Sequence, residues 1–261
     1  MASLTVAATA PFGADVLERL VQHHDVELLL TRPDKPRGRG RTLQPTPAKQ
    51  VAERLGIAVA QPPKLDVSVE IPTEVVVVCA YGLLIPESLL QHGLWLNVHP
   101  SLLPRWRGAA PVERALLAGD TETGVTIHQT IKELDAGPIA AQEAFPLSDG
   151  DDAGTVYERS AEIAARLLDQ AIARPEFALQ SEEGATYAEK IAPDDRELDL
   201  TRDPRELVNR VRALSPHIGA RLGDLLVWRA HVNHDGVFEP LEVQPAGGKR
   251  MPYDAYLRGR R

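Results

Sequence analysis

Cysteine is almost absent from this chain. A single cysteine among 261 residues excludes an intramolecular disulfide and argues against a zinc site built on several thiolates. Cys79 closes the apolar run of residues 74–80, where a buried core thiol is the expected role. The eight histidines show no metal-ligand spacing such as H-E-x-x-H. We therefore expect no metal site, and the lone thiol agrees with a reducing, cytoplasmic environment.

Long apolar runs and several common motifs are also missing. No apolar run approaches the length of about 20 residues that spans a bilayer, and residues 1–13 lack the features of a signal peptide. The first strand-to-helix turn, residues 7–12, lacks the glycines of a dinucleotide-binding turn. No G-x-S-x-G nucleophile elbow occurs. We expect no membrane association, no dinucleotide cofactor and no acyl-serine chemistry.

Hydrophobic patterns in the first hundred residues predict alternating strands and helices. The run of valines within residues 74–79 has no alternation, which is typical of a parallel strand covered on both faces. The order of elements predicts an α/β, doubly wound, Rossmann-like domain. Strands are expected at residues 4–8, 26–30, 57–60, 74–79 and 94–99, and helices at residues 12–22, 47–55 and from residue 86.

The later part of the chain predicts a second, smaller module. Proline, serine and glycine between residues 173 and 184 are typical of a linker. We predict one domain of residues 1–173, a linker of residues 174–195 and a small β-rich domain of residues 196–261. Helices are expected at residues 109–117, 155–172 and 204–214, and strands at residues 125–129, 139–145, 225–232 and 241–244.

Three polar residues near the middle of the chain are candidates for catalysis. Residues 96–99 alternate apolar and polar as in a strand, so Asn97 and His99 are expected to project from one face. Pro100 follows at once and cannot continue a central ladder, which puts the pair at the carboxyl end of the strand. Ligands bind at that edge of open α/β sheets. Asp135 stands before Ala-Gly, a setting that by itself indicates only a turn.

An amide, an imidazole and a carboxylate suit acyl transfer through a tetrahedral intermediate. Asn97 would donate a hydrogen bond to the oxyanion. His99 would be a second donor or a proton shuttle, while Asp135 would orient the imidazole, raise its pKa and accept a proton. Because the sequence offers no activated nucleophile, direct transfer between two bound substrates is favoured over a covalent acyl-enzyme. Taken alone, each residue has the plainer alternative of a turn or surface polar group.

The same segment resembles the signature of the folate-dependent formyltransferases, N-x-H-x-S-L-L-P followed by D-x-G. The match runs over Asn97, His99, residues 101–104, Asp135 and Gly137. The resemblance implies that 10-formyltetrahydrofolate, as cosubstrate, supplies a formyl group to an amine. It also implies that Asn97, His99 and Asp135 form the catalytic trio.

Segments outside the trio resemble the methionyl-tRNA formyltransferases in particular. They are residues 31–49, 105–116, 186–191 and 241–261, so the resemblance covers the whole chain. It implies transfer to the α-amino group of methionyl initiator tRNA, for translation initiation. It also implies a Rossmann-like catalytic domain followed by a smaller, reduced OB-like barrel that helps to hold tRNA.

The resemblance also places the folate. The pterin would lie against residues 81–86 and the loop of residues 125–138, with backbone groups at its pyrimidine edge and apolar side chains flanking the ring. A plainer alternative is that Leu84 and Ile85 only cover the end of the sheet. The residues expected to line this site are Tyr81, Gly82, Leu84, Ile85, Ser101, Leu102, Leu103, Pro104, Val125 and Gly137.

The net charge of −8 is unusual for an RNA-binding protein, but the distribution of charge matters more than its sum. A basic surface gains from counterion release against a tRNA backbone. We expect tRNA contacts from an exposed, adaptable arm at residues 32–41 and from the C-terminal tail. A merely solvated face is the alternative for the tail. The residues proposed to bind tRNA are Lys35, Arg37, Arg39, Arg41, Lys249 and Arg250.

Some features depart from the family pattern and leave other functions open. Ala8 stands where the first turn usually has glycine, residues 65–74 are too few for a helix, and the module after Val232 is short. The alternative function is a formyltransferase for a small amine, such as glycinamide ribonucleotide or an amino-sugar nucleotide. A non-enzymatic binder of folate or tRNA is a third hypothesis. Nothing in the sequence demands more than a monomer.

Overall fold

The computed structural model of the chain describes residues 1–37 and 42–259. It divides into two compact units. The N-terminal unit comprises residues 1–107, 124–144 and 158–185, and the C-terminal unit comprises residues 108–123, 145–157 and 186–261. The chain thus passes between the units several times. The domain boundaries expected from the sequence stay a prediction about which segments fold on their own.

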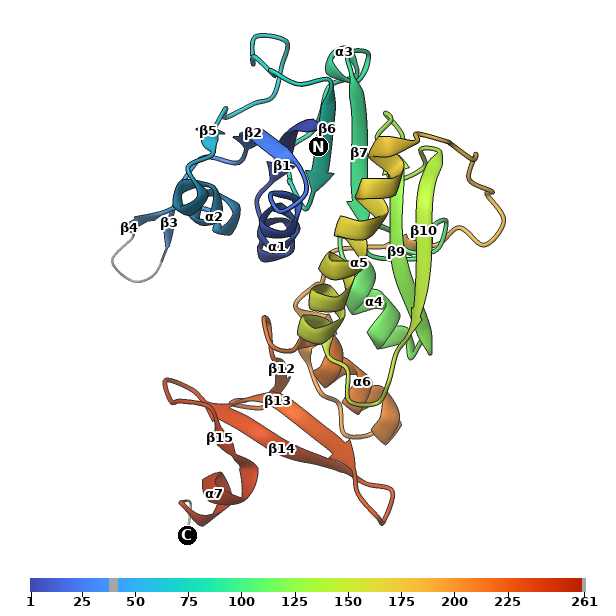
Figure 1. Ribbon diagram of the computed structural model, residues 1–261. Coiled ribbons are helices and arrows are strands. Elements are labelled where there is room, and N and C mark those ends of the chain that lie inside the picture. The colour runs from blue at the N-terminus through green and yellow to red at the C-terminus, as the bar shows by residue number, and fades with distance from the viewer. Residues whose placement is uncertain (38–41, 260–261) are drawn as a thin grey trace. The chain divides into compact units, whose positions relative to one another are not determined.

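A seven-stranded sheet organises the N-terminal unit, in the order β10-β9-β7-β6-β1-β2-β5 (Figure 1). The strands from β5 to β7 are parallel, and β9 pairs antiparallel with β7. From β1 the chain first builds outward through β2 and β5, then returns to add β6 beside β1, so the switch point lies between β1 and β6. The strands are β1 (Ser3–Ala8), β2 (Asp25–Leu30), β5 (Ala58–Ala60), β6 (Val75–Cys79), β7 (Leu94–His99), β9 (Glu122–Gln129) and β10 (Ile139–Pro146).

Helices flank this sheet, and α2 begins and ends where the sequence signals predict. In α2, the Thr46 side chain accepts a hydrogen bond from the Lys49 amide at 3.1 Å, and Gly56 ends the helix with a φ of 73°. In α1, a Cβ at Gly13 would lie 2.8 Å from the Ala8 Cβ, so glycine here lets the helix approach β1 despite the alanine at position 8. The helices are α1 (Pro11–Leu20), α2 (Pro47–Leu55), the single turn α3 (Glu87–Leu90) and α5 (Ala153–Ala173).

A buried cluster lies on one side of this sheet and includes both aromatic residues of the region, Tyr81 and Trp95. The Trp95 indole N–H donates to the carbonyl oxygens of Leu89 and His92, at 3.1 and 3.0 Å, so its polar edge is satisfied. Leu83 and Ile85 pack against the cluster from the loop after β6. The cluster therefore anchors the loop that follows the central valine-rich strand.

The predicted adaptable arm is more regular than the sequence indicated. Its two ends, β3 (Lys35–Arg37) and β4 (Thr42–Gln44), form an antiparallel pair. Arg39 and Arg41 lie outside the described residues. All three residues of β4 are exposed, namely Thr42, Leu43 and Gln44. Because neither face of this strand is buried, an alternation of apolar and polar residues could not have identified the hairpin in the sequence.

The C-terminal unit packs helices against a four-stranded antiparallel sheet in the order β12-β13-β14-β15 (Figure 1). Leu207, Val211 and Leu214, spaced along one face of α6, enter its core together with Val227 and Val243. The expected β-rich module is confirmed as this four-stranded sheet. Its elements are α4 (Pro111–Ala118), β8 (Arg107–Gly108), β11 (Tyr187–Ala188), the 3₁₀ turn η1 (Asp194–Arg196), α6 (Pro204–Leu214), β12 (Ala220–Leu222), β13 (Leu225–Val232), β14 (Phe238–Pro245), β15 (Met251–Pro252) and α7 (Tyr253–Arg258).

The α/β fold class predicted from the sequence is confirmed, and α2, β7, α6 and β13 have the predicted bounds. Residues 65–74 contain a turn, bends and irregular backbone but no helix. Pro86 precedes α3 as its cap residue and is not its first helical residue. Within the described residues, no helix is both long and apolar enough to cross a membrane.

Candidate active site

Strand β7 places Asn97 and His99 on one face at the carboxyl edge of the sheet. In the antiparallel pairing with β9, Asn97 stands opposite His128 and His99 opposite Thr126. Neighbours across a β-ladder share a face, so these four side chains form one polar patch. Asn97 is partly buried and His99 is only 4% exposed. The predicted pair therefore projects together, as the alternation of residues 96–99 indicated.

Asp135 enters this patch from the loop between β9 and β10. Its Oδ1 accepts a hydrogen bond from Asn97 Nδ2 at 3.3 Å and lies 3.6 Å from His128 Nε2. Its Oδ2 lies 3.8 Å from His99 Nδ1. The structure thus brings Asp135, 38 positions after Asn97, to the pair on β7, with the carboxylate between the amide and the imidazole.

The His99 ring is held by one hydrogen bond to the backbone. Nε2 donates to the carbonyl oxygen of Trp106 at 2.8 Å, because a carbonyl oxygen can only accept. In the neutral ring, Nδ1 is then the unprotonated nitrogen, and it faces Asp135. The proton position that the sequence left open follows from this contact.

Two opposing effects set the pKa of His99, and the expected effect of Asp135 is the smaller one. Burial lowers the pKa of His99 below its ordinary value, and this effect exceeds the raising effect of the Asp135 carboxylate. His128 lowers the His99 pKa further, while the hydrogen bond to Trp106 raises it. The free site therefore favours a neutral imidazole, not the charged one that a neighbouring carboxylate alone would predict.

His128 is a site residue that sequence reasoning missed. Its Nδ1 donates to the Gln129 carbonyl oxygen at 3.0 Å, which leaves Nε2 to accept from Asn97 Nδ2 at 3.0 Å. The two N–H groups of Asn97 are thus directed at His128 and Asp135. The only sequence signal was the alternation of polar Thr126 and His128 within strand β9, and it gained meaning only from the pairing with β7.

Three residues other than glycine adopt positive φ angles in the loops around this site. They are Ala80 at 47°, Trp106 at 64° and Asp135 at 49°. Left-handed backbone is uncommon for such residues and tends to occur at functional sites. Ala80 follows β6, Trp106 supplies the carbonyl for His99, and Asp135 supplies the carboxylate, so the strained positions coincide with the loops that shape the patch.

The residues expected to line the folate site fall into two groups. Gly82 and Leu84 are exposed in the loop after β6, with Leu84 86% exposed, whereas Ile85 packs against the core. The Tyr81 side chain is buried in the core, and burial raises its pKa to about 12. Only its backbone could therefore meet a ligand. The Tyr81 carbonyl oxygen accepts from Thr9 Oγ1 at 2.6 Å, which ties this loop to the one after β1.

The remaining predicted residues mostly build the support of the site. Ser101, Leu103 and Val125 are buried. The Thr126 hydroxyl accepts from the Leu103 amide at 3.2 Å and donates to the Ser101 carbonyl oxygen at 2.7 Å. Leu102 and Pro104 are partly buried in the same turn. This turn thus fixes the segment after β7 against β9.

Two exposed leucines stand at the same edge. Leu84 lies in the loop after β6, and Leu134, 64% exposed, precedes Asp135. An ion pair between Lys132 Nζ and Glu87 Oε2, at 3.8 Å, links the two loops. Exposed apolar side chains can pack against a heteroaromatic ring, and the buried polar patch beside them can bind the polar substituent of that ring. The leucines and the polar patch at this edge thus fit a formylated folate.

The basic residues predicted to bind tRNA are placed unevenly. Lys35 is exposed on β3, and Lys249 is exposed before β15. The Arg250 guanidinium lies 3.5 Å from the centre of the Trp228 ring and donates to the Pro216 carbonyl oxygen at 2.8 Å. Arg250 is therefore partly committed to its own unit.

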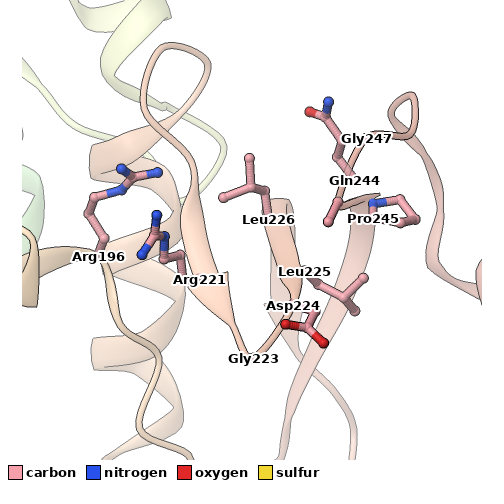
Figure 2. Close-up of a pocket in the computed structure, with 10 residues that line it drawn as sticks. Arg196, Arg221, Gly223, Asp224, Leu225, Leu226, Gln244, Pro245 and Gly247 are labelled. Atoms are coloured by element: carbon pink, nitrogen blue, oxygen red, sulfur yellow. The ribbon is translucent and has the colours of Figure 1, made fainter.

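A surface pocket of about 440 Å³ lies in the C-terminal unit (Figure 2). Arg196 points into this region but donates to the carbonyl oxygens of Ile218 and Gly219. The pocket contains none of the three candidate catalytic residues. Among residues 1–37 and 42–259, no three His, Cys, Asp or Glu side chains gather as a metal site. The residues that line the surface pocket are Arg196, Arg221, Gly223, Asp224, Leu225, Leu226, Gln244, Pro245, Ala246 and Gly247.

Comparison with known proteins gives the family of the chain. Residues 4–172 match the formyl transferase family. Methionyl-tRNA formyltransferases from Dechloromonas aromatica (strain RCB) and Aromatoleum aromaticum (strain DSM 19018 / LMG 30748 / EbN1) are 38% and 42% identical. The first comparison covers 98% of this chain and 95% of the relative, and the second covers 97% and 92%. The chain belongs to the methionyl-tRNA formyltransferase family.

Further comparisons place this family member among known folds and lengths. The alignment with the Dechloromonas relative spans 292 positions against 261 residues here, so that relative carries insertions. A solved N-formyltransferase from Helicobacter canadensis, in complex with folinic acid and dTDP-3-aminofucose, shares the fold with a TM-score of 0.71. It is 18% identical, over 97% of this chain and 99% of that one.

Proposed function

We propose that this chain transfers the formyl group of 10-formyltetrahydrofolate to the α-amino group of methionyl initiator tRNA. The observation that carries the proposal is the convergence of Asn97, His99 and Asp135 at one sheet edge, in a chain similar to methionyl-tRNA formyltransferases over nearly its whole length. The folate supplies the formyl carbon, and the amine of the charged tRNA attacks it. The product supports translation initiation. In this proposal the chain acts as a monomer in the cytoplasm.

Asn97 acts as the oxyanion donor in this proposal. Its two N–H groups point at His128 Nε2 and Asp135 Oδ1, and the contact with Asp135 is the longer one, at 3.3 Å against 3.0 Å. The developing oxyanion takes the place of the longer contact, while the contact with His128 keeps the amide oriented. Such a donor gains strength in a site that excludes water.

His99 acts first as a proton acceptor. The neutral ring presents Nδ1 toward the site, and Asp135 lies 3.8 Å beyond it. As the amine attacks, Nδ1 takes the proton that the nitrogen loses, and Asp135 stabilises the resulting imidazolium. The bond between the formyl carbon and N10 then breaks, N10 keeps the electron pair, and the same proton passes from His99 to N10. The products are formylated amine and tetrahydrofolate, so atoms and charge balance.

No covalent acyl-enzyme is part of this proposal. Cys79 is buried in β6, and burial raises the pKa of its thiol well above the ordinary value. A buried thiol of that kind is a poor nucleophile. Direct transfer between the two bound substrates therefore agrees with the residues at this edge of the sheet.

The folate and tRNA contacts complete the proposal. Gly82, Leu84, Leu134 and the backbone of Tyr81 would hold the pterin beside Asp135. The basic segment of residues 35–44 and the tail around Lys249 would contact the phosphates of the acceptor arm. These contacts are supported by the exposed Lys35 and Lys249 and by similarity to methionyl-tRNA formyltransferases.

A parallel acceptor assay tests the proposed function. Formyl transfer from 10-formyltetrahydrofolate is measured with methionyl initiator tRNA, glycinamide ribonucleotide and a dTDP-linked amino sugar as acceptors. Turnover on the charged tRNA alone is the expected result. Turnover only on a small amine would mean that the chemistry has been assigned correctly but the acceptor has not. No turnover with any acceptor would reject enzymatic formyl transfer.

A further inference from the structure

We propose that Gln180 is a positioning residue that, with Arg107, holds the backbone of the Asp135 loop in its productive conformation. The inference rests on the proposed function, because it concerns how the Asp135 carboxylate reaches the reacting groups. Gln180 belongs to the segment that the sequence presents as a linker. Its side-chain contacts show a different role.

The Gln180 amide spans the gap between the loop and Arg107. Its Nε2 donates to the carbonyl oxygen of Asp135 at 2.8 Å and to that of Gly137 at 2.7 Å. Its Oε1 accepts from Arg107 Nε at 3.2 Å and from Arg107 Nη2 at 3.0 Å. Both hydrogens and both lone pairs of the amide are used. The partners also fix which end of the amide is which, since carbonyl oxygens only accept and a guanidinium only donates.

Arg107 is itself fixed in place. Its side chain is 3% exposed, and its Nη1 and Nη2 contact both carboxylate oxygens of Glu182 at 3.2 and 3.1 Å. A buried, bidentate guanidinium is a rigid support because its planar donors permit one orientation. The backbone of the same segment pairs with β10, where the amides of Ile139 and Ala178 exchange hydrogen bonds at 2.7 and 2.9 Å (Figure 1). Gln180 therefore reaches the loop from an anchored segment.

The loop needs such a clamp because its conformation is strained. Asp135 has a φ of 49°, a left-handed conformation that is costly for a residue with a Cβ. The clamp holds the carbonyl oxygen of this very residue, and the carbonyl oxygen two residues later. Rotation of this backbone would swing the carboxylate away from Asn97 and His99. A displacement of about 1 Å at a catalytic group can cost on the order of 100-fold in rate.

Gln180→Glu tests the two donated bonds in isolation. The variant keeps the size of the side chain and an acceptor for Arg107, but it places carboxylate oxygens against two carbonyl oxygens. We expect kcat for formyl transfer to fall by roughly 10- to 100-fold, with KM for the folate changed much less. Gln170→Glu, on the exposed face of α5, is the matched control and should keep wild-type turnover. If Gln180→Glu does not fold, Gln180→Met removes the same bonds without adding charge.

A double-mutant cycle distinguishes positioning from a general loss of structure. In the Asp135→Asn background, Gln180→Glu should change single-turnover rates by less than about 2-fold, because the group that it positions has already been disabled. The same loss in both backgrounds, or wild-type kcat for Gln180→Glu, would overturn the inference. Wild-type turnover of Asp135→Asn would instead reject the catalytic assignment of Asp135. The two failures are thus separable.

Discussion

The carbonyl oxygen of Trp106 lies 2.8 Å from Nε2 of His99. This contact fixes the neutral tautomer of His99 and leaves Nδ1 for the reacting amine. Trp106 presents the carbonyl from a left-handed conformation, with a φ of 64°. The tryptophan thus contributes to the site through its backbone, a role that its residue type does not reveal.

The first prediction concerns the protonation of His99. Because burial disfavours the charged ring more than Asp135 favours it, the pKa of His99 should lie below its ordinary value of 6.5. Asp135→Asn should lower the pKa further, since the carboxylate is lost and His128 still acts against protonation. Nitrogen NMR of the histidine rings measures both, with His99→Gln identifying the resonances. A His99 that is charged at pH 7 would contradict the proposed first proton transfer.

The lowered pKa of His99 also affects the stability of the fold at acid pH. A histidine whose pKa is lower in the folded chain resists protonation there, so acid favours the unfolded chain. His99 should therefore destabilise the fold as the pH falls below the unfolded-state value of 6.5. Denaturant unfolding of the wild type and His99→Gln between about pH 7 and 5 measures the difference. An equal pH dependence for the two proteins would contradict this prediction.

The second prediction concerns Asn97. Asn97→Ala removes the oxyanion donor and should lower turnover on the order of 10²- to 10³-fold, with a smaller change in the folate KM. Steady-state formyl transfer measures both constants. His128→Ala is the informative comparison, because it leaves the Asn97 amide in place and removes the group that orients it. A larger loss for His128→Ala than for Asn97→Ala would reverse the roles assigned to the two residues.

The third prediction concerns the fit of the Asp135 loop against β9. A Cβ at Gly137 would lie 1.8 Å from the Gln129 carbonyl oxygen, so Gly137→Ala must displace the loop. We expect a loss of about 1–3 kcal/mol in the free energy of unfolding and a drop in turnover of roughly 100-fold. Gly150→Ala is the control, since the nearest atom to its Cβ, Ser148 Oγ, is 4.0 Å away. Equal behaviour of the two variants would refute the close packing.

The fourth prediction concerns the basic segment of residues 35–44. Replacing Arg37, Arg39 and Arg41 together with alanine should weaken the use of charged tRNA. The slope of the logarithm of apparent affinity against the logarithm of salt concentration should fall by about 1 for each phosphate that the arm no longer neutralises. Turnover at saturating tRNA should change little, because the trio is untouched. An unchanged salt slope would count against this arm as a tRNA-binding element.

The shared face of Asn97 and His99 could be predicted because its signals are local. Alternation in residues 96–99 places Asn97 and His99 on one face, and Pro100 marks the strand end. Spacing alone did not predict that Asp135 lies beside that pair. The expectation came from the resemblance to the formyltransferases. The raising effect of Asp135 on the His99 pKa was predicted, but the net lowering was not, since a sequence gives the neighbouring charge and not the depth of burial that outweighs it.

The α/β class, the bounds of α2, β7, α6 and β13 and the common face of Asn97 and His99 follow from the sequence, because hydrophobic period, prolines and caps act over a few residues. Which of these polar groups meet depends on the tertiary structure. His128 joins the site through its register with Asn97, and Gln180 reaches Asp135 from a segment that looked like a linker. Such interactions depend on strand order and on backbone angles between distant residues, which no local pattern encodes.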